Sequence, residues 1–121
     1  MTESAAIRDL AELRDRLRTF ARERDWEQYH SPKNLAMALI AEAAEIVEHF
    51  QWLTEKESEN LPLDRRSPVA DELADVLVYL VRLADKLDID LLVAVSDKIK
   101  RNEAKYPVSR VKGSARKYTE Y

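Results

Sequence analysis

Apolar residues recur every three or four positions over four long stretches of this chain, and that spacing is typical of amphipathic helices. The first stretch covers residues 4–24 and carries Ile7, Leu10, Leu13, Leu17 and Phe20. The second follows Ser31-Pro32, where a serine can cap a helix that begins with proline, and it runs to about Leu53. Polar segments at residues 24–30 and 54–66 break the period and predict loops.

The second half of the chain repeats this start signal. Ser67-Pro68 opens a third predicted helix that runs to about Leu87, and Asp88 or Asp90 can cap a fourth that ends before Pro107. Four helices of roughly 15–23 residues with short loops predict an all-α fold, a four-helix bundle. We expect one helical domain over residues 1–107 and a basic C-terminal tail over 108–121 that orders only against a partner or ligand.

The composition supports helices and excludes some sites. The chain has 121 residues, one glycine and no cysteine, so it forms no disulfide framework and no thiolate metal site. The N-terminus lacks an apolar signal core and no stretch reaches membrane-spanning length, so we expect a cytoplasmic, soluble protein. The third helix is apolar over an arc too wide for one thin bundle to cover, which predicts self-association.

Charge is unevenly distributed along the chain. The formal net charge is -3, yet Lys98 to Lys117 holds eight Lys or Arg residues and one acid, Glu103. An acidic body with a basic end could bind a metal on one side and phosphates on the other. The alternative is a helix with a solvated basic face and a polar tail.

Two carboxylate pairs are the main candidates for chemistry, Glu42-x-x-Glu45 in the second helix and Glu72-x-x-Asp75 in the third. Residues three apart on a helix lie about 60° apart, so the two acids of a pair point the same way. Both Glu42 and Glu72 border the apolar stripe of their helix. Carboxylates on an inner face are costly unless a positive group or a cleft compensates them.

A divalent metal with oxygen ligands is the compensation that suits four carboxylates, and Mg²⁺ would complete its shell with water and substrate phosphates. The alternative is two solvent-facing pairs in contact with lysines, since a single such motif on a helix is very common. Iron is disfavoured, because di-iron bundles need Glu-x-x-His in two helices and His30 and His49 do not form that pattern.

Neighbouring side chains could hold a nucleotide. Trp52 lies two turns beyond Glu45, and Tyr79 lies one turn beyond Asp75, so aromatic rings beside the acids suggest a stacked base. Ordinary core packing explains the same spacing, for Trp26 as well. On the fourth helix a shared face at i, i+4 and i+7 could bind phosphate, sugar or base, or could be a solvated face; it carries Lys98, Asn102 and Lys105.

The two acid pairs with their 26-residue gap resemble the signature of the all-α nucleoside triphosphate pyrophosphatases, the MazG-like superfamily. Further segments look like its dCTP pyrophosphatase branch, and the resemblance covers nearly the whole chain. These segments are Arg24-Asp25-Trp26-Glu27-Gln28-Tyr29-His30, Phe50-Gln51-Trp52, Asp75-Val76-Leu77-Val78-Tyr79-Leu80, Lys105-Tyr106-Pro107 and Arg116-Lys117-Tyr118-Thr119-Glu120.

The resemblance implies a house-cleaning enzyme that hydrolyses a deoxynucleoside triphosphate, dCTP or a modified dCTP, to the monophosphate and pyrophosphate. It implies Mg²⁺ on Glu42, Glu45, Glu72 and Asp75, with catalytic roles for Glu45, Glu42 and Lys98. The implied substrate-binding residues are Trp26, His30, Trp52, Tyr79, Lys98, Asn102, Lys105 and Tyr106. It also implies an intertwined oligomer, either a tetramer, which is favoured, or a dimer. Leu17 stands where the mammalian branch has a pocket histidine, which affects the base preference.

Three alternatives stay open from the sequence. A related pyrophosphohydrolase acting on dUTP or a phosphoribosyl nucleotide differs only in the aromatic segments. A non-catalytic helical interaction module would keep the apolar stripes but gain nothing from four inward acids. A nucleic-acid binder could use the basic tail, although the acidic body argues against it.

Overall fold

The computed structural model of the chain describes residues 6–120, which form helices and loops without a strand. The all-α class is therefore confirmed, and the four long predicted helices are present as α1, α2, α4 and α5. The α-helices are α1 Leu10–Glu23, α2 Pro32–Phe50, α3 Glu55–Ser58, α4 Leu63–Lys86, α5 Leu91–Lys105 and α6 Val108–Val111; two 3₁₀ turns are η1 Glu27–Tyr29 and η2 Tyr118–Glu120.

The helices divide into two compact units. The first unit ends at Asp88 and holds α1 to α4, and the second begins at Ile89 and holds α5, α6 and η2. The predicted domain boundary at residue 107 stays a prediction.

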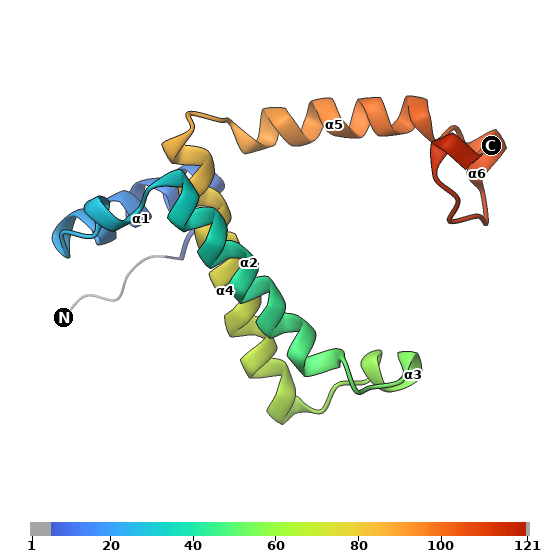
Figure 1. The fold of residues 1–121 in the computed structure, drawn as a ribbon, viewed down its shortest axis with the longest axis horizontal. Coiled ribbons are helices and arrows are strands. Elements are labelled where there is room, and N and C mark those ends of the chain that lie inside the picture. Colours follow the sequence, from blue (N-terminus) through green and yellow to red (C-terminus); the bar gives the residue numbers. More distant parts are fainter. Residues whose placement is uncertain (1–5, 121) are drawn as a thin grey trace. The chain divides into compact units, whose positions relative to one another are not determined.

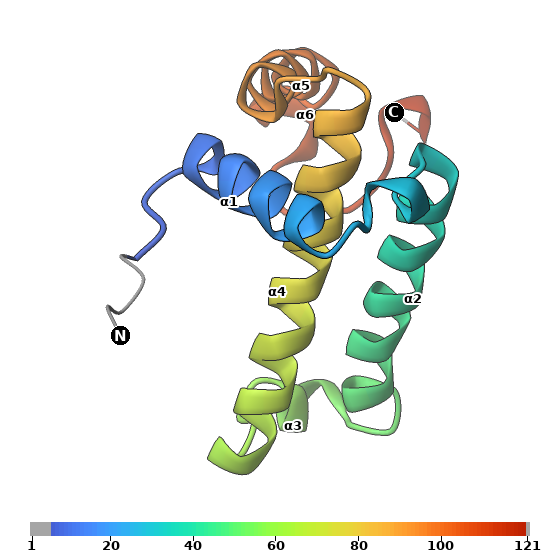
Figure 2. The same cartoon turned by 90° about the vertical axis from the view of Figure 1, so that its left-hand side faces the viewer.

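In the first unit α2 and α4 lie side by side and antiparallel, and α1 packs across α4 (Figures 1 and 2). The small apolar core sits where these three helices meet. Leu35 of α2 is 1% exposed and is the largest fully buried side chain. The other buried apolar residues of the described chain are Leu13, Ala21, Val69, Val81 and Ala84.

Two of the predicted helix starts are confirmed by their caps. The Ser31 hydroxyl accepts a hydrogen bond from the backbone N–H of Asn34 at 3.2 Å, with Pro32 at the first helical position. The Asp90 carboxylate accepts one from the Val93 N–H at 3.1 Å, so Asp90 caps α5. Helix α2 ends at Phe50, three residues before the predicted Leu53.

The predicted start of the third helix at Ser67-Pro68 is wrong, because α4 already begins at Leu63. Pro62 enters the helix in an extended conformation, and its carbonyl accepts hydrogen bonds from the N–H groups of Arg65 and Arg66 at 3.0 and 3.2 Å. Pro68 then lies within the second turn, where its missing N–H leaves only one exposed carbonyl without a helical partner. The predicted loop 54–66 also contains α3, which Thr54 and Glu57 start with a reciprocal capping box.

In the second unit the tail contacts the end of α5, and the expectation that it orders against a partner or ligand stays a prediction. The Tyr118 ring packs edge-on against Tyr106, with ring centroids 6.0 Å apart, and the Lys105 ammonium lies 4.8 Å from the centre of the Tyr118 ring. Within residues 6–120, none of the helices is both long and apolar enough to cross a lipid bilayer.

Candidate functional site

The four predicted acids lie on the two helices that pack against each other, Glu42 and Glu45 on α2 and Glu72 and Asp75 on α4. Their charges act on one another. Burial raises the pKa of Glu42, and the hydrogen-bonded Glu45 carboxyl and the charges of Glu45, Asp75 and Glu72 raise it further. The antiparallel α2–α4 pair therefore brings both predicted motifs into one electrostatic cluster.

One acid of each pair is half-buried and the other is exposed. Glu42 and Glu72 are half-buried, and the Oε2 atom of each is enclosed by protein without accepting a hydrogen bond. Glu45 and Asp75 are exposed. This arrangement agrees with the prediction that Glu42 and Glu72 border the apolar stripes. The surface alternative requires contacts between these acids and lysines. Within residues 6–120 none of the four acids forms an ion pair with a lysine.

His49, which is not among the predicted site residues, joins this cluster. Its Nε2 lies 2.6 Å from Glu72 Oε2. His49 follows Glu45 by four positions, so it lies one turn further along the same face of α2. That i, i+4 spacing is the sequence signal that could have identified it.

The cluster has the chemistry of a divalent cation site. Two buried carboxylate oxygens, one on each helix, accept no hydrogen bond, although Glu72 Oε2 lies beside His49 Nε2. Buried carboxylates are costly as anions and suit a hard cation with oxygen ligands. As the side chains are arranged, however, no three His, Asp or Glu groups within residues 6–120 converge closely enough to hold an ion. The four-carboxylate metal site thus stays a prediction with a fitting donor set.

The aromatic residues differ in exposure. Trp52 is 87% exposed just beyond the end of α2, so it is not core packing within this chain. Tyr79 is half-buried on α4. Trp26 is 43% exposed, and its ring meets Phe20 and His30 edge-on, at centroid distances of 5.6 and 6.3 Å. An exposed ring such as Trp52 is available for stacking against a ligand.

The backbone places Trp26 through the end of α1. Asp25 adopts a left-handed conformation with φ 55°, and the Trp26 N–H donates to the Ala21 carbonyl at 2.8 Å while the Asp25 N–H donates to Arg22 at 3.1 Å. These two bonds form a Schellman motif, and the Phe20–Trp26 contact closes it on the apolar side. The direction of the Trp26 side chain is thus determined locally.

The remaining predicted residues belong to the second unit. Lys98, Asn102 and Lys105 lie exposed on α5, and Tyr106, which caps α5, is half-buried. Their place beside the acids stays a prediction.

Comparison with known proteins identifies similar sequences. Residues 38–121 match the model of the MazG-like family. The chain is similar to relatives named dCTP pyrophosphatase 1: the protein of Mus musculus is 47% identical and that of Homo sapiens 46% identical over 103 residues, 84% of this chain. The chain spans 61% of the length of these relatives.

A solved structure is similar over nearly its whole length. A pyrophosphatase from Archaeoglobus fulgidus superposes with a TM-score of 0.75 at 42% identity, covering 88% of this chain and 99% of that one. Both acid pairs fall within the matched family region, together with Trp52, Tyr79 and all of α5. The chain therefore belongs to the MazG-like family.

Proposed function

We propose that the chain is a Mg²⁺-dependent pyrophosphohydrolase that converts a deoxynucleoside triphosphate, dCTP or a modified dCTP, to the monophosphate and pyrophosphate. The observation that carries the proposal is the acid cluster on α2 and α4, with its two buried oxygens that accept no hydrogen bond. The names of the dCTP pyrophosphatase relatives support the substrate. The role is house-cleaning of the nucleotide pool in the cytoplasm.

Glu42, Glu45, Glu72 and Asp75 would hold the metal. When bound, Mg²⁺ neutralises the triphosphate and polarises the α-phosphorus. The mutual repulsion that raises the pKa of Glu42 is the electrostatic reason for a cation to bind there.

The chain's own residues perform the proton and charge steps of this proposal. A water attacks the α-phosphorus in line with the leaving oxygen, and the Glu45 carboxylate orients that water and accepts its proton. The bond between the α-phosphorus and the bridging oxygen breaks, and pyrophosphate leaves. Lys98 is assigned to neutralise the charge of the leaving pyrophosphate. Glu42 is assigned a catalytic role beside Glu45.

We assign nucleotide contacts to Trp26, His30, Trp52 and Tyr79 in the first unit. Trp52 would stack on the base, which its 87% exposure permits. In the second unit the contacts are assigned to Lys98, Asn102, Lys105 and Tyr106.

Self-association is part of the proposal, with a homotetramer favoured over a dimer. Large apolar side chains on both packed helices of the first unit remain exposed; they are Met37, Ile40 and Val47 on α2 and Leu73, Leu77 and Leu80 on α4. Exposed apolar surface on paired helices that already bury one face suits a second copy of the same helices.

Pyrophosphate release from a panel of nucleoside triphosphates with Mg²⁺ tests the function. The panel contains dCTP, 5-modified dCTP, dUTP and a phosphoribosyl nucleotide. We expect release from dCTP or its modified form, and we expect Glu45→Gln and Asp75→Asn to abolish turnover while the helical circular dichroism stays unchanged. Turnover by either folded variant at the wild-type rate would refute the site, and release only from dUTP or the phosphoribosyl nucleotide would refute the substrate.

A further inference from the structure

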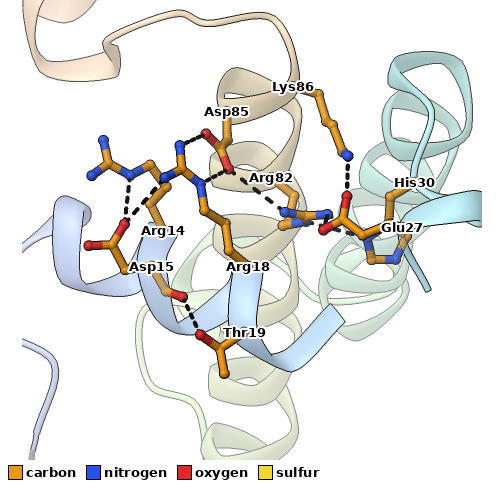
Figure 3. A network of polar contacts seen from close by, with 9 residues as sticks. All are labelled: Arg14, Asp15, Arg18, Thr19, Glu27, His30, Arg82, Asp85 and Lys86. Atoms are coloured by element: carbon orange, nitrogen blue, oxygen red, sulfur yellow. Dashed lines mark hydrogen bonds and ion pairs between the residues drawn. The ribbon is translucent and has the colours of Figure 1, made fainter. Parts of the chain in front are cut away.

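A buried arginine connects α4 to the segment that carries Trp26 and His30. Arg82 is only 3% exposed and lies within the apolar run of α4. Its Nη2 donates to Glu27 Oε1 at 3.1 Å, and its Nη1 lies 3.7 Å from Asp85 Oδ2 (Figure 3). A buried guanidinium is tolerated only when it is paired and hydrogen-bonded, and these two carboxylates meet that need.

The same guanidinium faces the His30 ring. Its Nε donates to His30 Nδ1 at 3.3 Å, and its Nη2 lies 3.1 Å from the same ring nitrogen. A guanidinium remains protonated in proteins and has no acceptor atom, so its N–H groups can only donate. The nitrogen that faces them must accept, and the single ring proton of a neutral His30 is then on Nε2.

We infer that Arg82 is a positioning residue, which fixes His30 as the Nε2-protonated neutral tautomer and holds the connecting segment (residues 24–31) against α4. His30 then offers one hydrogen-bond donor, which suits an acceptor atom of the substrate such as a pyrimidine carbonyl oxygen. The role of His30 in binding rests on the proposed function, whereas its tautomer does not.

Two further contacts hold the connecting segment in place. Lys86, one turn beyond Arg82, forms an ion pair with Glu27, so these two cations of α4 bind the same carboxylate (Figure 3). His30 in turn meets the Trp26 ring edge-on. Burial and the positive charge of Arg82 lower the pKa of His30, and nearby Lys86 acts in the same direction while Glu27 opposes them.

Nitrogen NMR of the two histidine rings tests the tautomer in the intact wild-type protein. The chain has only two histidines, so a His49→Gln variant assigns the signals. We expect His30 to show an acceptor-type Nδ1 and a protonated Nε2 at neutral pH, and to stay neutral to a lower pH than free histidine. A proton on Nδ1, or titration at or above the pKa of free histidine, would overturn the inference.

Three substitutions separate positioning from mere packing. Arg82→Gln removes the fixed donor, Arg82→Lys keeps the charge, and Arg18→Gln breaks the neighbouring pair with Asp85 without touching His30. We expect Arg82→Gln to give a tautomer mixture and to raise the KM for dCTP about tenfold, with kcat changed by less than about twofold. Arg82→Lys should show more of the Nε2-protonated His30 signal than Arg82→Gln. Arg18→Gln should leave the His30 signals unchanged.

The outcomes distinguish this inference from the proposed function. An unchanged His30 spectrum in folded Arg82→Gln would overturn the inference, whereas a changed tautomer with an unchanged KM would overturn the role of His30 in substrate binding. If Arg82→Gln fails to fold, the wild-type spectrum and the Arg82→Lys variant still decide the tautomer. If the tautomer is as inferred but the wild-type protein releases no pyrophosphate from any nucleotide, the proposed function fails and the part of the inference about Arg82 and His30 stands.

Discussion

The Arg18–Asp85 pair that joins α1 to α4 gives a quantitative prediction about stability. Arg18 Nε and Nη2 donate to the two oxygens of Asp85 at 2.7 and 2.5 Å, and the Asp85 side chain is 11% exposed. Hydrogen bonds to charged groups contribute about 1.5–3 kcal/mol each when shielded, and the 44% exposure of Arg18 reduces this through solvent screening. We therefore expect Asp85→Asn to lower the free energy of unfolding by about 2 kcal/mol.

Thermal unfolding measures this loss. An entropy of unfolding of about 2.1 cal/mol/K per residue makes 1 kcal/mol equal to about 4 °C in Tm for a chain of this length, so Asp85→Asn should lower Tm by about 8 °C. Asp15→Asn is the matched control, since Asp15 contacts the same Arg18 at 3.7 Å but is 61% exposed. That variant should change stability by less than about 0.5 kcal/mol.

The pH dependence provides an independent check on the same pair. The Arg18 hydrogen bonds, with the charges of Arg18, Arg82 and Arg14, lower the pKa of Asp85, so the folded state holds this proton less tightly than the unfolded chain. The stabilisation is present above the unfolded Asp pKa of about 3.9 and is lost as pH falls from there through the folded pKa. The difference in Tm between wild type and Asp85→Asn should become smaller as pH falls through that range. Equal Tm shifts for Asp85→Asn and Asp15→Asn would refute the reasoning. A Tm difference between wild type and Asp85→Asn that stays constant at acid pH would also refute it.

Three further predictions concern the site and the core. In metal-free protein Glu42→Gln should raise the free energy of unfolding at neutral pH. The raised pKa of Glu42 means that its charged form destabilises the fold, so wild-type stability increases as pH falls toward that pKa. Urea unfolding at several pH values measures this, and a variant less stable than wild type would contradict it. Trp52→Ala should leave Tm unchanged, because the side chain is 87% exposed, but raise the KM for dCTP; an unchanged KM in steady-state kinetics would remove Trp52 from the base pocket. Leu35→Ala should cost about 2–5 kcal/mol in urea unfolding, since Leu35 is 1% exposed, and a loss below about 1 kcal/mol would show that the core relaxes around the cavity.

Local signals in the sequence predicted the parts of the fold that depend on neighbouring residues. Ser31-Pro32 and Asp90 marked helix starts because a cap and a fixed proline φ act within one turn. Pro68 misled the prediction, because the same residue type is also tolerated early in a helix that Pro62 has already begun.

Tertiary contacts were harder to predict from the sequence. Helical periodicity placed Glu42 and Glu72 beside the apolar stripes of their own helices. It could not predict that α2 and α4 pack antiparallel and so bring the two acid pairs together. The Arg82 contacts with Glu27 and His30 depend on the path of the connecting segment, which no periodicity describes. A charged residue in the run Val78–Ala84, which is otherwise apolar, was the available signal of a buried partner.

Direct titration of the protein with Mn²⁺, a spectroscopic substitute for Mg²⁺, tests the central claim that the acids of α2 and α4 hold a divalent cation for a nucleotide's phosphates. Wild type should bind Mn²⁺, and a non-hydrolysable dCTP analogue should strengthen binding, whereas Glu72→Gln and Asp75→Asn should each weaken it by at least about tenfold with helicity preserved. Equal Mn²⁺ binding by wild type and both folded variants would contradict the account.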